Sequence, residues 1–162
     1  MGKLRFEVLM KSGMSPYVAT TESGRVIATL HRPTWPKQPS LLDMEGRQYR
    51  IVHEAASNNF LLNDHRYALM DGEATLASCI ARPAERTTDV AIGDATCHLV
   101  RRNRWLSIRY AVEDGNGRAL GSIAETTGFS LWRRKFRVEV PDGLDGPQAM
   151  FLFYLVAAFS FR

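Results

Sequence analysis

The side chains best suited to bind a ligand lie in the run Leu131–Glu139, LWRRKFRVE. On a β-strand, alternate residues face opposite sides, so Arg133, Lys135 and Arg137 are expected to share one face. Trp132, Phe136 and Val138 would then face the other side, and Arg134 departs from the alternation. Cations spaced about 6.6 Å apart on an outward face form a row that phosphate groups can follow. The solvated exterior of a barrel explains the same pattern, and both interpretations stay open.

The charge of the chain is unevenly distributed around this run. Residues 101–137 hold nine Lys/Arg against three Asp/Glu, whereas the rest of the chain holds twelve against fourteen. Arg101, Arg102 and Arg104 would extend the basic row if their strand lies near it. A local excess of positive charge favours an anionic partner.

Signatures of catalysis are missing from the sequence. It contains no G-x-S-x-G, P-loop, H-E-x-x-H or C-x-x-C motif, and its four histidines are scattered singly. Cys97 and His98 are neighbours on an expected strand, so they point to opposite faces and do not share a metal. Cys79 and Cys97 are expected to be buried free thiols, with a redox pair as the alternative. We therefore expect no catalytic residue, no metal and no cofactor.

The element that organises the chain is its apolar C-terminal segment. Every residue from Ala149 to Phe159 is apolar, which predicts a helix over residues 147–162 that is buried on all sides. Asp145 and Pro147 suit its start. Its length of about 22 Å is short of the roughly 30 Å of a bilayer core, so we expect no transmembrane span. The expected core side chains of this helix are Phe151, Phe153, Leu155 and Phe159.

The preceding 146 residues read as about a dozen short strands separated by turns. Hairpin signals include Glu22-Ser23-Gly24, Met44-Glu45-Gly46-Arg47 and Asp114-Gly115-Asn116-Gly117. Further strands are expected at residues 60–63, 89–92 and 104–113. Trp35 lies in a proline-rich loop. The pattern predicts a mainly β single domain, residues 1–162. Its economical architecture is a closed antiparallel barrel (1–146) of about twelve strands around the central apolar helix (147–162).

A family resemblance agrees with this architecture. The segments that carry it are Tyr67–Asp71, Arg118–Ile123, Val138–Gly143 and Ala149–Phe161. In their order the chain resembles the tubby C-terminal-like superfamily, closest to its LURP-one-related branch, with phospholipid scramblases as distant relatives. The resemblance implies a twelve-stranded barrel around a helix and a non-enzymatic role at phospholipid or phosphoinositide-like headgroups. A calcium-binding segment proposed in scramblases corresponds here to Asp142 and Asp145, two carboxylates where calcium takes six to eight oxygens.

The function expected from these observations is that of a non-enzymatic binding module. It would dock on an anionic membrane surface through Arg133, Lys135, Arg137, Arg101, Arg102 and Arg104. Without a secretory signal and with few cysteines, the expected location is cytoplasmic and peripheral to the membrane. One alternative is a small-ligand carrier or enzyme with an interior barrel site. The other is a nucleic-acid binder that stacks bases on Trp132 or Phe136, which the core-facing position expected for these aromatics disfavours.

Overall fold

The computed structural model describes residues 3–11, 16–33, 38–55, 64–82, 85–103, 107–127, 133–141 and 143–160. The β-strands are β1 (Lys3–Lys11), β2 (Tyr17–Thr20), β3 (Val26–His31), β4 (Ser40–Met44), β5 (Arg47–Ala55), β6 (His65–Asp71), β7 (Ala74–Ala81), β8 (Thr87–Ile92), β9 (Ala95–Arg101), β10 (Arg109–Glu113), β11 (Ala119–Glu125) and β12 (Arg133–Pro141). One helix follows, α1 (Gly146–Ser160).

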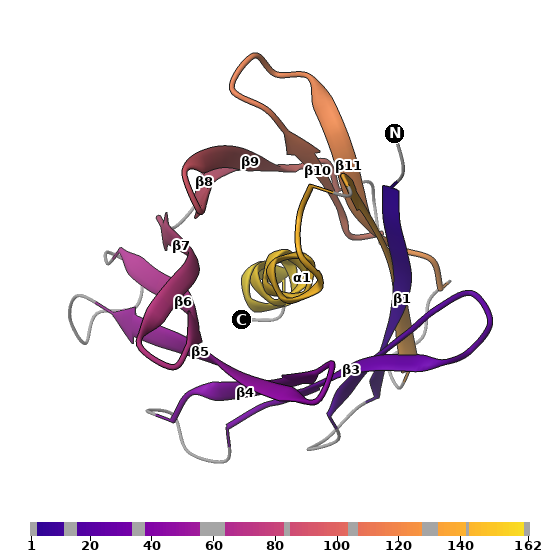
Figure 1. Cartoon of the computed structure of the whole chain (residues 1–162). Coiled ribbons are helices and arrows are strands. Elements are labelled where there is room, and N and C mark those ends of the chain that lie inside the picture. Colours follow the sequence, from indigo (N-terminus) through magenta and orange to yellow (C-terminus); the bar gives the residue numbers. More distant parts are fainter. Residues whose placement is uncertain are drawn as a thin grey trace.

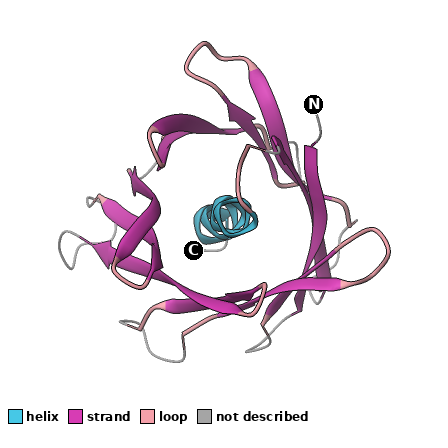
Figure 2. Ribbon diagram, viewed as in Figure 1, coloured by secondary structure: helices cyan, strands magenta, loops and turns pink. Residues whose placement is uncertain are grey.

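The strands form a closed antiparallel barrel. Each strand pairs with its neighbours in sequence, and β1 pairs with β12 from Lys3↔Pro141 to Lys11↔Arg133. Figure 1 looks along the barrel and shows the ring of strands around α1, which is seen end-on. Figure 2 shows the same ring coloured by secondary structure. Closure pairs every strand on both sides, so the barrel presents no open sheet edge. The fold class expected from the sequence is therefore confirmed.

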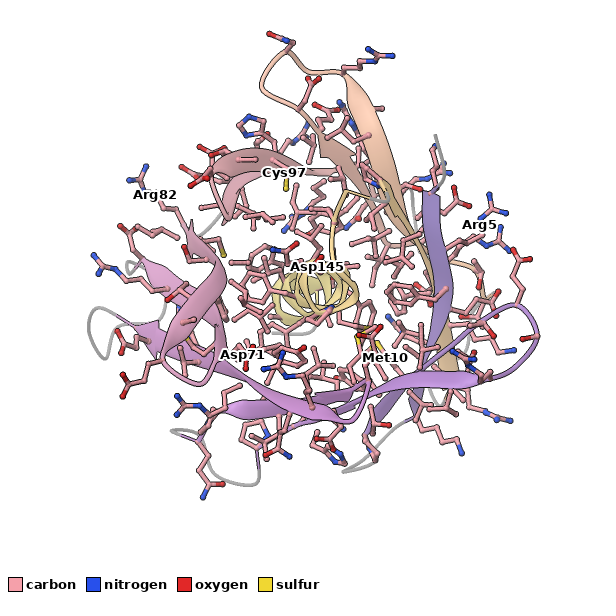
Figure 3. All side chains as sticks on the ribbon, in the orientation of Figure 1. Arg5, Met10, Asp71, Arg82, Cys97 and Asp145 are labelled. Carbon is pink, nitrogen blue, oxygen red and sulfur yellow. The ribbon has the colours of Figure 1, made fainter. Side chains whose placement is uncertain are left out.

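Alternation of side chains builds the interior from both the strands and the helix. On β1, Phe6 and Val8 are fully buried, whereas Glu7 between them is only partly buried. Figure 3 shows Met10 and Cys97 on the inner side of the ring and Arg5 and Arg82 on the outer side. The inward apolar side chains of the strands meet an apolar helix, which fills a barrel too wide for strand side chains alone.

Helix α1 is apolar on all sides and buried along most of its length. Phe151, Phe153 and Leu155 are fully buried, as expected, but Phe159 is only partly buried because the helix ends one residue later. The helix begins at Gly146, one residue earlier than expected, and residues 161–162 lie outside the described residues. Among the described residues, no helix has the length and hydropathy needed to cross a bilayer.

Two side-chain contacts fix the start of the helix. The backbone N–H of Asp145 donates to Oε1 of Gln148 at 3.0 Å, the reciprocal half of a capping box. Nε2 of the same Gln148 donates to the carbonyl of Leu76 on β7 at 3.2 Å. Gln148 therefore caps α1 and also ties it to the barrel wall.

The two ends of the barrel differ in their connections. At one end, which we call the hairpin end, α1 begins and the strands are joined by five residues or fewer, in three cases by two. At the opposite end, which we call the C-terminal end, α1 finishes and the connections hold five to nine residues. The Glu22, Glu45 and Asp114 turns predicted from the sequence all lie at the hairpin end.

Some expected strand boundaries were wrong. The strand expected at 89–92 begins two residues earlier, at Thr87, because Thr88 continues the inward alternation of Val90 and Ile92. The strand expected at 104–113 pairs continuously only from Arg109. Residues 104–106 and the strand expected at 60–63 lie outside the described residues, as does Trp35.

Candidate functional site

The basic row on β12 faces outward as expected. Arg133, Lys135 and Arg137 are exposed, while Phe136 and Val138 are fully buried. We refer to these three cations as the β12 row. Trp132 lies outside the described residues.

Arg137 of the β12 row has an acidic partner on the neighbouring strand. A guanidinium nitrogen of Arg137 lies 3.8 Å from Oε1 of Glu7 on β1. Both side chains are more than one-third exposed, so this pair contributes little to stability and leaves the Arg137 charge available to a ligand. Within the described residues, no acidic side chain pairs with Lys135.

Arg134, the residue that departs from the alternation, points inward at the C-terminal end. Its Nε lies 3.8 Å from Oε1 of Glu125, whose side chain is only 5% exposed. The same oxygen accepts a hydrogen bond from the Thr127 hydroxyl at 3.3 Å. A polar side chain is tolerated on the inner face here because Arg134 lies at the end of the barrel and has an inward-facing carboxylate beside it.

Arg101, at the end of β9, and Arg102, which follows it, do not lie beside the β12 row, since β10 and β11 separate β9 from β12. Nε of Arg101 donates to the Tyr110 hydroxyl at 3.3 Å, and Arg102 pairs with Glu113 at 3.1 Å. Arg104 lies outside the described residues.

Arg101 and Arg102 instead line a groove with two further arginines, Arg86 and Arg109, which the sequence did not single out as ligands. This arginine groove has a volume of about 800 Å³. Its lining residues are Arg86, Arg101, Arg102, Asn103, Arg109, Tyr110, Ala111, Ala119, Gly121 and Ser122. Four arginine residues and no acidic residue line it, which suits an anion, and one of them, Arg102, is paired with Glu113 beside the groove.

The strand register connects the arginine groove to the β12 row. Arg109 pairs with Ala124 on β11, and Ala124 pairs with Arg137 on β12. Two strand spacings of about 4.8 Å therefore place the Arg109 and Arg137 backbones about 10 Å apart, with only an alanine between them. The two features form one basic surface on the exterior of β9–β12.

The structure also joins two histidines that look isolated in the sequence. Nε2 of His53 lies 2.8 Å from Nδ1 of His65, and the His53 ring stacks on Tyr67 at 4.4 Å. Tyr67 contacts Phe159 edge-on at 6.0 Å, which places this cluster against the last turns of α1. No sequence motif indicated the pair; only the register of β5 and β6 brings it together.

The cysteines do not form a redox pair. Cys79 and Cys97 are both buried and neither is in a disulfide. Both pair in register with Val90, which lies between them on β8. Two strand spacings of about 10 Å exceed the separation that a disulfide can bridge. Burial raises the pKa of the Cys97 thiol to about 11, which keeps it protonated at neutral pH.

The described residues offer no metal site. They contain no cluster of three or more His, Cys, Asp or Glu side chains able to hold an ion. Asp142 lies outside the described residues, and the backbone of Asp145 belongs to the helix cap. His98 contacts Asp89 at 2.6 Å, on the opposite face from buried Cys97, as the alternation predicted.

A larger groove of about 1170 Å³ lies mainly over the outer faces of β5–β9. Its charges are mixed, and Arg82, one of its two arginines, already pairs with Asp64 at 3.6 Å and with Glu85 at 3.7 Å. This groove therefore has no net preference for an anion.

No protein-family model, curated protein or solved structure matches the chain. The resemblance to the tubby C-terminal-like superfamily stays a prediction, while the barrel and central helix are properties of this structure.

Proposed function

We propose that the protein is a non-enzymatic binding module that docks on anionic phospholipid headgroups through the arginine groove and the β12 row. The observation that carries the proposal is the lining of the groove, with four arginines and no acidic residue. Guanidinium groups bind phosphate oxygens in a bidentate geometry, and Asn103 and Ser122 add neutral hydrogen-bonding groups.

The positions of the basic side chains also support a surface ligand. Arg109, Lys135 and Arg137 are exposed and lie on a continuous exterior face. A membrane presents many headgroups at once, so separated cations on one face act together, each contributing about 1 kcal/mol near the surface.

The alternatives have less support from the described residues. An interior ligand would have to displace α1, whose side chains from Ala149 to Val156 are buried apart from Tyr154. A nucleic-acid site that stacks bases on Phe136 is disfavoured because this ring is fully buried and contacts Phe153.

The proposal is tested by sedimentation with phosphatidylserine-containing vesicles, using paired charge reversals. Arg86→Glu with Arg109→Glu changes the groove by four charge units, and neither side chain has an acidic partner among the described residues. We expect affinity to fall by two orders of magnitude or more, on the order of 1 kcal/mol per charge.

The matched control is Arg25→Glu with Arg118→Glu, an equal change of charge at exposed positions of the hairpin end. This control should retain most of the binding. Changing the β12 row to alanine should weaken binding as well. Equal losses in the groove variant and the control would show that only net charge matters and would reject the groove.

A further inference from the structure

The two ends of the barrel carry opposite charge. The contrast holds among the strand-terminal residues and the described residues that connect one element to the next. The C-terminal end holds eight basic residues (Lys11, Arg32, Arg82, Arg86, Arg101, Arg102, Arg109, Arg133) and three acidic residues (Asp64, Glu85, Glu125). The hairpin end holds four basic residues (Lys3, Arg25, Arg47, Arg118) and eight acidic residues (Glu22, Glu45, Asp71, Glu73, Asp94, Glu113, Asp114, Asp145). Within the described residues the barrel is therefore a charge dipole along its axis.

Most ion pairs of these residues lie within one end, although Arg102 of the C-terminal end pairs with Glu113 of the hairpin end along the short strand β10. All three acids of the C-terminal end have basic partners, Arg82 for Asp64 and Glu85 and Arg134 for Glu125. At the hairpin end, Glu45, Glu73, Asp94 and Asp114 have no basic partner among the described residues. The charge left for a partner is thus positive at one end and negative at the other.

Turn chemistry and the helix dipole explain only part of the pattern. Asp and Glu beside glycine suit tight turns, which accounts for acids such as Glu45 and Asp94 at the hairpin end. The dipole of α1 favours acids at its start and bases at its end, but it amounts to about half a charge at each end. Neither effect requires eight basic residues around the C-terminal end.

Along its longest strands, β1 and β12, the barrel separates the two ends by more than the range of electrostatic screening. Strand β12 has nine residues, and at about 3.3 Å per residue with a barrel tilt near 40° its ends lie about 20 Å apart along the axis. The Debye length at physiological salt is about 8 Å. Along β1 and β12, a surface that touches the C-terminal end is therefore screened from the acids of the hairpin end, whereas at β10 the Arg102–Glu113 pair joins the two ends. A surface along the side of the barrel meets charges of both signs.

We infer that the barrel stands upright on an anionic bilayer, with its C-terminal end against the headgroups and its hairpin end directed away. This orientation rests on the proposed function. It assigns the docking surface to the described basic residues of the C-terminal end, of which those of the arginine groove and the start of the β12 row are one part.

A pair of fluorescent labels tests the orientation. Ala55 and Asn116 are both exposed, and Ala55 ends β5 at the C-terminal end. Asn116 lies in the hairpin between β10 and β11, at the other end and on the side of the groove. Strand β5 lies across the ring from β11, as Figure 1 shows. Upright docking brings Ala55 to the membrane, and docking on the β9–β12 side brings Asn116 there.

The experiment labels Ala55→Cys or Asn116→Cys with a polarity-sensitive dye and adds vesicles of phosphatidylcholine and phosphatidylserine that carry a quencher in the headgroup region. Because Cys79 and Cys97 are buried, the unsubstituted protein provides the blank for labelling. We expect several-fold stronger quenching at residue 55 than at residue 116, and none with phosphatidylcholine alone.

Stronger quenching at residue 116 would overturn the upright orientation and keep the proposed function. A lack of sedimentation with the same vesicles would reject both. The fluorescence of the label at residue 55 could instead change on adding an RNA or DNA duplex and stay constant on adding vesicles. This result would assign the C-terminal end to nucleic acid and also overturn the proposal.

Charge reversal at the two ends of one strand gives an independent check. Lys3 and Lys11 end β1 at opposite ends of the barrel, are both exposed and are the same residue type. Lys11→Glu should weaken vesicle binding on the order of tenfold, while Lys3→Glu should leave it nearly unchanged. Equal effects of the two reversals would contradict upright docking.

Discussion

Replacing Phe153 with alanine should destabilise the barrel more than almost any other single change in α1. The side chain is fully buried, and its ring contacts Phe136 at 5.5 Å and Tyr17 at 6.0 Å, both edge-on. Loss of a buried phenylalanine costs about 3–5 kcal/mol, which includes the two aromatic contacts. In a domain of 162 residues, about 4 kcal/mol lowers Tm by roughly 8–16 °C.

The assay is urea unfolding followed by far-ultraviolet circular dichroism, with Phe159→Ala as the matched control. Phe159 is only partly buried, at the end of the helix, so its loss should cost about 1–2 kcal/mol. The reasoning would be refuted if both variants cost the same amount or if Phe153→Ala cost less than about 1 kcal/mol. Either result would mean that α1 is not the packed centre of the barrel.

Three further predictions concern backbone packing, pH and the inward ion pair. Gly121→Ala should destabilise the protein because a Cβ there would collide with the β12 backbone, whereas Gly115→Ala, which has open space, should be nearly neutral in the same urea assay. Burial raises the pKa of the Cys97 thiol from 9.0 to about 11, so between these pH values the folded state keeps a proton that the unfolded state releases. The free energy of unfolding should therefore fall as pH rises through this interval, and it should fall less in Cys97→Ala. Arg134→Met should destabilise by leaving the buried Glu125 carboxylate without its cation, and adding Glu125→Gln should recover part of the loss in a double-mutant cycle.

The parts of the fold that depend on local pattern were predictable from the sequence. The alternation around Phe136 correctly separated the outward β12 row from the core, because strand periodicity is a property of neighbouring residues. The apolar helix was predictable for the same reason, and its burial follows from the lack of any polar face. The expected closure of the barrel is confirmed by the β1–β12 pairing.

The candidate site was predictable only in part, because it depends on which strands become neighbours. The sequence singled out Arg101 and Arg102 as an extension of the β12 row, from which β10 and β11 separate them. The contribution of Arg86 and Arg109 to the groove follows from the placement of β8 and β10 beside β9. The proximity of His53 and His65 likewise comes from strand register and not from spacing along the chain. A two-residue turn sets the register of the two strands that it joins, so the registers at these turns could have been predicted from the sequence.

The most direct test of the proposed function is co-sedimentation of the unsubstituted protein with vesicles of phosphatidylcholine alone or with phosphatidylserine, at low and at high salt. Docking through exposed arginines and lysines predicts binding to the anionic vesicles only, with an affinity that falls steeply as salt rises. Binding that is equal for both vesicles, or no binding to anionic vesicles at low salt, would contradict the proposal that the basic surface of this barrel is a headgroup site.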